Sequence, residues 1–258
     1  MNNLFQAVSD NLKFVAVFIV TIAACFFLAW LFEKLAQKRG GVKEKILTTR
    51  KIAVIGVFSA ISAVLMLFEF PLPFAPSFYK LDFSELPALI GGFAFGPVTG
   101  VMIEFIKVLL HLAIKGTSTA FVGEYANFVV GVSFILTSTV VYDFVKNRVG
   151  ALISCIAGTL MLTVVGTAFN AVYLLPTFAK LYGMPMDALI GMGTAINPKI
   201  TNVTSFVILA VAPLNLIKGG VDSLITFLVY KQLSPILKYN KATRREVRER
   251  KSKEIAAN

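Results

Sequence analysis

Seven segments of the chain are rich in apolar residues and are joined by short polar connections. They run over residues 12–32, 52–69, 86–96, 98–114, 125–145, 150–175 and 204–232. A helix needs about 20 mostly apolar residues to cross a bilayer, and most of these segments approach or exceed that length. The third segment is short, and only Gly96 and Pro97 separate it from the fourth. The pattern predicts an all-α protein, a polytopic bundle of membrane helices.

The composition supports a membrane protein. Hydrophobic residues make up 57% of the chain, charged residues 15%, and the mean hydropathy is +0.77. These values are typical of an integral membrane protein and exclude an ordinary soluble domain. The net charge of +11 could indicate nucleic-acid binding. The basic residues lie in short segments beside apolar ones, however, so they indicate orientation in the bilayer, and no nucleic-acid partner is expected.

The distribution of Lys and Arg predicts which ends lie in the cytoplasm. Seven basic residues follow the first apolar segment: Lys34, Lys38, Arg39, Lys43, Lys45, Arg50 and Lys51. The tail over residues 235–258 is basic as well. Cytoplasmic connections carry an excess of Lys and Arg, so both regions are expected inside the cell. With seven crossings, the N-terminus then lies outside and the C-terminus in the cytoplasm of a plasma-membrane protein.

The first apolar segment has a second interpretation. Ile22-Ala23-Ala24-Cys25 resembles a lipoprotein cleavage site. The residues before it are poorly charged, and further apolar residues follow Cys25, so a transmembrane helix is favoured. The other cysteine, Cys155, also lies in an apolar segment. Both are expected to pack in the bundle, and neither indicates a disulfide or a metal site.

The last apolar segment contains a lysine where a charge costs at least about 2.5 kcal/mol. Asn215, Lys218 and Asp222 share one helical face. Lys218 and Asp222 are four residues apart and could neutralise each other. Alternatively, the Asn215 amide and the Lys218 ammonium could bind a planar ligand rich in carbonyls and ring nitrogens, or a carboxylate. The residues leave both interpretations open.

Other polar positions lie within or beside the apolar segments. Glu104, Lys107 and His111 share a face, where the first two can form an ion pair or all three can relay protons. Asn170 lies near the external end of its segment and could join two helices or contact a ligand. The proline-rich and aromatic segment from Glu69 to Pro97 cannot be regular helix at its start, and is either an aromatic belt or a loop that covers a ligand.

Small residues on the second apolar segment would let another helix approach closely. They are Gly56, Ser59, Ala60 and Ala63. The sequence has no G-x-x-x-x-G-K-[ST], no G-x-S-x-G and no cysteine–histidine cluster. No catalytic residue, metal site or cofactor is therefore expected, and the protein is predicted not to be an enzyme.

Several motifs resemble one known family. EFPLPF, YKLDFSELPALIGGFAFGPVTGVMIEFIKVLLH, GEYANFVVG, FNAVYLLP and PLNLIKG are similar to the riboflavin-specific substrate-binding component (S-component) of energy-coupling factor (ECF) vitamin transporters. The similarity covers roughly Arg50 to Tyr230. The segment 12–32 is additional to the six helices usual in that family.

The resemblance implies a fold and a division of the chain. Residues 50–234 would form a six-helix vitamin-binding domain, preceded by an extra transmembrane helix with its basic connection over 1–49 and followed by the tail over 235–258. Such a subunit captures riboflavin, or its phosphorylated form FMN, from outside. It then associates with a transmembrane coupling protein and two cytoplasmic ATPases.

The resemblance also implies roles for individual residues. Asn170, Asn215 and Lys218 match positions that bind the flavin ring, and Lys80, Leu81 and Asp82 match a loop beside the ribityl chain. Gly56, Ser59, Ala60 and Ala63 match the helix that docks on the coupling protein. Riboflavin enters as the transported ligand and not as a cofactor. The alternatives are an S-component for another vitamin, a stand-alone proton-coupled carrier, and a membrane protein without a ligand.

Overall fold

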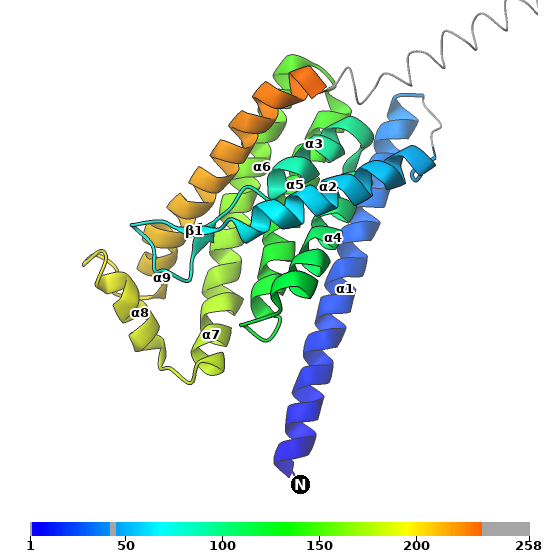
Figure 1. The fold of residues 1–258 in the computed structure, drawn as a ribbon. Helices are drawn as coiled ribbons and strands as arrows, with labels where there is room; N and C mark the ends of the chain where they lie inside the picture. Colours follow the sequence, from blue (N-terminus) through cyan, green and yellow to red (C-terminus); the bar gives the residue numbers. More distant parts are fainter. Residues whose placement is uncertain (1, 42–44, 234–258) are drawn as a thin grey trace, which may run out of the picture.

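The computed structural model describes residues 2–41 and 45–233, with side chains from residue 15 onward. The predicted basic tail over 235–258 and Lys43 lie outside the described residues. The chain forms a bundle of helices (Figure 1). The elements are α1 (Asn2–Arg39), α2 (Thr49–Leu67), β1 (Phe70–Pro71), β2 (Lys80–Leu81), α3 (Glu85–Phe95), α4 (Pro97–Lys115), α5 (Val122–Phe144), α6 (Arg148–Phe169), η1 (Asn170–Leu174), α7 (Leu175–Leu181), α8 (Met186–Thr194), α9 (Val203–Phe206) and η2 (Val207–Val211).

Six helices of the described residues are long and apolar enough to cross a membrane. They are Val15–Arg39, Thr49–Leu67, Pro97–Lys115, Val122–Phe144, Arg148–Leu181 and Val203–Leu233. The fifth combines α6, η1 and α7, and the last begins with α9 and η2 and continues as helix to residue 233. The prediction of an all-α membrane bundle with an additional N-terminal helix is confirmed.

The third apolar segment does not form a helix that could span the bilayer. α3 has 11 residues, which at ~1.5 Å per residue is about 16 Å of helix against a hydrocarbon core of about 30 Å. The preceding residues 68–84 form an irregular segment with one short antiparallel pair, in which Phe70 lies opposite Leu81. We name residues 68–84 the cover segment. The third predicted helix is therefore present but is shorter than the other six, because the prolines prevent helix before Ser84.

α3 and α4 form a tight hairpin. Gly96 joins them with a φ of 105°, a conformation that favours glycine. Glycines also let the two helices approach closely, since a Cβ on Gly100 would lie 3.3 Å from the carbonyl oxygen of Ala88. The hairpin directs the first residues of α3 toward the middle of α4.

The additional helix α1 packs against α4 and α5. Ala29 is fully buried in this contact, and the rings of Phe26 and Phe105 meet edge to face. Near the end of α1, the buried Glu33 carboxylate lies 3.0 Å from Lys51 Nζ and accepts a hydrogen bond of 3.0 Å from the backbone N–H of Val98. That N–H is in the first turn of α4 and has no partner within its own helix. Glu33 therefore connects α1 to the starts of α2 and α4.

We name the end of the bundle around Glu33 the basic end. The ends of α1 and α5 meet there, because the guanidinium of Arg39 lies 5.7 Å from the ring of Phe144. The N-terminal ends of α2 and α4 are there too. We name the opposite end, where the cover segment meets the last turn of α4, the pocket end.

The small residues of α2 do not share one exposed face. Gly56 and Ala60 are exposed, whereas Ser59 and Ala63 are buried. The Ser59 hydroxyl lies 3.5 Å from the carbonyl oxygen of Ile103 in α4. Ser59 and Ala63 pack α2 on its own chain, and the docking face predicted from all four residues stays a prediction.

Candidate functional site

A cavity of about 460 Å³ opens at the pocket end, between the cover segment and helices α4 and α5, η1, α7 and the last helix. Its volume is within the range of small-molecule sites. Five of the six residues predicted to bind substrate line it: Lys80, Asp82, Asn170, Asn215 and Lys218. Leu81 is buried but does not line the cavity. The structure thus brings together polar residues that are up to 138 positions apart in the sequence, from Lys80 to Lys218.

Two π-helical segments position one wall of this cavity. η1 begins at Asn170, and η2 contacts η1 from the last helix. A π-helical turn changes the direction of the side chains that follow it and is frequent at functional sites. Asn170 donates from Nδ2 to the carbonyl oxygen of Gly166 at 2.7 Å. This bond fixes the orientation of the Asn170 amide, so that its Oδ1 atom can accept a hydrogen bond from another residue.

Tyr79 of the cover segment supplies that donor. Its hydroxyl donates to Asn170 Oδ1 at 2.6 Å. Burial raises the pKa of Tyr79, so the hydroxyl keeps its proton and donates. The ring lies 4.7 Å from that of Phe78 and 6.1 Å from that of Phe206, between centroids. Tyr79 therefore joins the cover segment to the wall of the cavity.

Asn215 has a buried donor without a partner. Among the described residues, no acceptor bonds to its Nδ2. The amide packs against Gly166, where a Cβ would lie 2.5 Å from Nδ2. An unpaired buried polar group costs about 1 to 3 kcal/mol. A ligand with a carbonyl oxygen or a ring nitrogen at this point would remove that cost.

Lys218 faces the cavity, and its charge is balanced by residues remote in sequence. Its ammonium lies 2.9 Å from Glu85 Oε2 and 3.3 Å from Asp82 Oδ2. The predicted pairing with Asp222 is not the one that forms: Asp222 is fully buried, and within the described part of the chain its carboxylate accepts no hydrogen bond. The cover segment and the start of α3 bring two carboxylates to Lys218, which the helical spacing of Asp222 does not indicate.

Beneath the cavity is a buried group of charges that we name the charged floor: Asp82, Glu85, Glu104, Lys107 and Lys218. Lys107 Nζ lies 2.6 Å from Glu104 and 3.2 Å from Glu85, and donates to the Ser84 hydroxyl at 2.9 Å. The predicted Glu104–Lys107 pair is confirmed. Glu85 was not predicted, although a carboxylate in the first turn of an apolar helix is a signal that could have identified it.

The opening of the cavity is polar, and we name it the mouth. Glu69 accepts a hydrogen bond of 2.7 Å from Lys80 and another from Lys115. Burial disfavours its charge, but the two lysines outweigh this and hold the pKa of Glu69 below its usual value. On the other side, the hydroxyls of Thr117 and Thr119 donate to Glu124 at 3.0 and 3.2 Å. The mouth therefore contains two lysines, which both pair with Glu69, and two carboxylates, Glu69 and Glu124, which both accept hydrogen bonds.

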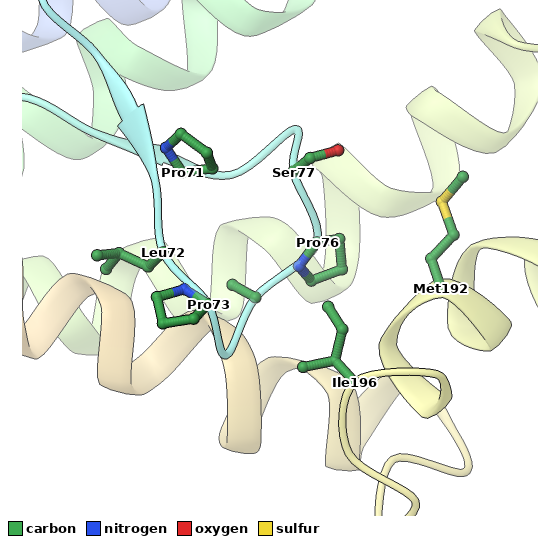
Figure 2. A pocket seen from close by; sticks show the side chains of 8 residues that line it. Pro71, Leu72, Pro73, Pro76, Ser77, Met192 and Ile196 are labelled. Atoms are coloured by element: carbon green, nitrogen blue, oxygen red, sulfur yellow. The ribbon is translucent and has the colours of Figure 1, made fainter.

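A second cavity, of about 420 Å³, lies between the cover segment and the region of α8. Figure 2 shows Pro71, Pro73 and Pro76 on one side and Met192 and Ile196 on the other. Ser77 contributes the one polar side chain of its lining. With so few polar groups this cavity cannot fix the orientation of a ligand, and it is not the candidate site.

Known proteins similar to this chain share a transport role. The family model described as "ECF transporter, substrate-specific component" matches residues 50–230. The riboflavin transporter FmnP of Bacillus subtilis is 32% identical over 72% of this chain and 93% of its own length. The riboflavin transporter RibU of Staphylococcus aureus is 33% identical over 73% of this chain and 93% of its own.

A solved structure gives the same result. It is the S component of a bacterial ECF transporter, with a TM-score of 0.57 and 33% identity over 73% of this chain and 97% of that one. α1 precedes the matched residues. Proteins of this kind are transporter components and not enzymes. From residue 50 to residue 230, this chain belongs to the family of substrate-specific components of ECF transporters.

Proposed function

We propose that this chain is a membrane subunit that captures riboflavin and delivers it through an ATP-driven ECF complex. The observation that carries the proposal is the buried, unpaired amide donor of Asn215, a residue that lines a cavity together with Asn170 and Lys218. The names of the similar proteins, riboflavin transporters, support the choice of vitamin.

The chemistry of the cavity suits a flavin ring. Rings and apolar side chains from the cover segment, η1, α7 and the last helix line one wall: Phe78, Tyr79, Leu174, Phe178 and Leu214. Such a wall favours a flat, partly apolar ring system. The ammonium of Lys218 and the amide of Asn215 offer donors to ring carbonyls and nitrogens. Asn170 offers an amide oxygen to a ring N–H once Tyr79 no longer occupies it.

The same framework supports proposals about partners and orientation. The exposed Gly56 and Ala60 on α2 would contact the transmembrane coupling protein, which in turn binds two cytoplasmic ATPases. The basic end, with Lys38, Arg39 and Lys51, would lie in the cytoplasm. The pocket end, and with it the N-terminus, would then lie outside, where the cavity can accept a vitamin from the medium.

Binding of riboflavin by purified protein tests the proposal. We expect copurified flavin in the mass spectrum, or quenching of riboflavin fluorescence on titration of flavin-free protein. A different vitamin in the mass spectrum would replace riboflavin as the substrate. Failure of both measurements would overturn the proposal.

Replacing Lys218 by alanine should weaken riboflavin binding by tenfold or more, because a charge-assisted hydrogen bond contributes about 1.5 to 3 kcal/mol. Asn215→Ala should also weaken binding, and it leaves the ion pairs of Lys218 in place. The matched control is Asn197→Ala, since Asn197 is an asparagine outside this cavity. Fluorescence titration measures all three. Equal affinities in the three variants would exclude the proposed ring contacts.

A stand-alone proton-coupled carrier is the second candidate. The fully buried carboxylate of Asp222 favours it, because it accepts no hydrogen bond and forms no close ion pair among the described residues. Riboflavin uptake into liposomes that contain this chain alone, driven by a pH gradient, would establish it. Uptake that requires the coupling protein, the ATPases and ATP would exclude it.

A further inference from the structure

The additional helix α1 presents one narrow face to the bundle. It runs beside α4 and α5 (Figure 1). From residue 15 onward, the covered side chains recur at helical spacing and include Phe18, Thr21, Cys25, Ala29 and Glu33, whereas most of the side chains between them are exposed. α1 precedes the residues that the family model matches, so the contacts of this face are the guide to what α1 does.

Two residues of this face contact Tyr125 of α5. The ring of Phe18 meets the Tyr125 ring edge to face, with 5.3 Å between centroids. Thr21 Oγ1 lies 3.1 Å from the Tyr125 hydroxyl and donates its own proton to the carbonyl oxygen of Val17 at 2.8 Å. Since a threonine hydroxyl has one proton, Tyr125 is the donor in the bond between the two side chains. α1 thus holds both the ring and the hydroxyl of a buried tyrosine.

Tyr125 connects α1 to the part of the cavity wall that contains Asn170. Its ring also lies 5.6 Å from the ring of Phe169 and 5.6 Å from that of Tyr173, between centroids. Those two rings lie 5.0 Å apart, and their residues flank Asn170 in the sequence. We name Tyr125, Phe169 and Tyr173 the ring cluster. Asn170 lines the cavity, whereas the three members of the ring cluster do not, so the cluster supports this wall from behind.

The backbone at Asn170 depends on contacts with its neighbours. Asn170 begins the π-helical turn η1, and such turns are rare, so the surrounding structure must favour this turn over a continuous α-helix. Tyr79 contacts the Asn170 amide, but the proposed ligand takes the place of that contact. The ring cluster does not line the cavity, so a ligand leaves its contacts in place. It can therefore hold η1 both before and after the ligand binds.

We propose that α1 positions the flavin site: Phe18 and Thr21 hold Tyr125, and through the ring cluster they fix the η1 turn and the Asn170 amide in the geometry that binds the ligand. Phe18 and Thr21 are positioning residues and do not contact the ligand. This inference rests on the proposed function. A site that is ordered before the ligand arrives binds more tightly, because less conformational entropy is lost on binding.

The test weakens the contacts of α1 and leaves every residue that lines the cavity unchanged. Thr21→Val removes the acceptor for Tyr125 at nearly constant shape, and Phe18→Leu removes the ring contact. Together they should raise the riboflavin dissociation constant by about threefold to tenfold, and Thr21→Val alone by about twofold to threefold, because part of the ordering then occurs on binding. Fluorescence titration of the purified full chain measures both variants.

Glu33→Leu is the matched control on the same helix. It loosens α1 at the basic end, and Glu33 does not line the cavity. This variant should unfold at lower dodecyl sulfate and keep the wild-type affinity for riboflavin. A second measurement identifies the route. In an Asn170→Ala background, the combined Phe18→Leu and Thr21→Val change should weaken binding no further, because residues that act through one group are not additive.

Several results would overturn this inference alone. They are an unchanged riboflavin affinity in both α1 variants, an equal loss of affinity in Glu33→Leu, and full additivity with Asn170→Ala. The equal loss would mean that affinity follows overall stability and not the position of η1. If the double variant does not fold, Thr21→Val decides, since it is nearly isosteric. Wild-type protein that binds no riboflavin would instead overturn the proposed function, and this inference with it.

Discussion

Replacing Lys107 by methionine is expected to lower the free energy of unfolding by about 3 to 5 kcal/mol, the usual effect of removing one partner from a buried ion pair. The Lys107 ammonium has no exposed surface and lies 2.6 Å from Glu104 and 3.2 Å from Glu85. Without it, Glu104 has lost its nearest positive charge, and Glu85 must share Lys218 with Asp82. Unfolding by dodecyl sulfate in mixed micelles, followed by circular dichroism, measures the change.

Lys115→Met is the matched control on the same helix. Lys115 pairs with Glu69, but it is exposed at the last turn of α4. An exposed pair contributes less than about 1 kcal/mol. Equal losses in the two variants would mean that burial does not decide the effect. A neutral Lys107→Met variant would mean that the charged floor is not ionised.

Replacing Glu33 by leucine should cost about 3 kcal/mol of unfolding free energy, because it leaves the Lys51 ammonium and the Val98 N–H without their partner. Both contacts are 3.0 Å long and buried. The value is at the lower end for a buried pair, since Lys51 lies in the first turn of α2 and its long side chain can extend toward water.

A double-mutant cycle supplies the control for Glu33. Replacing both charges by apolar residues is often close to neutral, whereas removing one of them is not. The variant with Glu33→Leu and Lys51→Met should therefore recover part of the stability lost in Glu33→Leu alone. Strict additivity of the two single losses would show that the residues do not interact.

Local patterns predicted the helices and part of the site. Apolar length identified the spanning helices, and three-residue spacing identified the Glu104–Lys107 pair, because both features depend on a single helix. Asn170, Asn215 and Lys218 were found because polar groups are expensive in a membrane segment. The structure brings these three side chains to one cavity.

Features that depend on several elements could not be predicted. Asp82 and Glu85 reach Lys218 only because residues 68–84 turn into the bundle, so helical spacing indicated Asp222 instead. Glu33 of α1 forms an ion pair with Lys51 of α2 and accepts a hydrogen bond from Val98 of α4, so its role depends on three helices. Ser59 and Ala63 could be assigned to an internal contact only once the position of α4 was known, because small residues suit any close helix contact.

The shortness of α3 has a consequence for how this scaffold can change its ligand. A full-length helix in its place would extend about 14 Å farther, through the space where the cavity lies. The cavity thus occupies the volume that the missing turns of α3 would fill. The irregular backbone of residues 68–84 is tolerated within the bundle because it borders a cavity and not lipid. Lengthening or shortening residues 68–84 is expected to resize the cavity and to leave the six membrane-spanning helices unchanged. Ligand size can therefore evolve separately from membrane insertion.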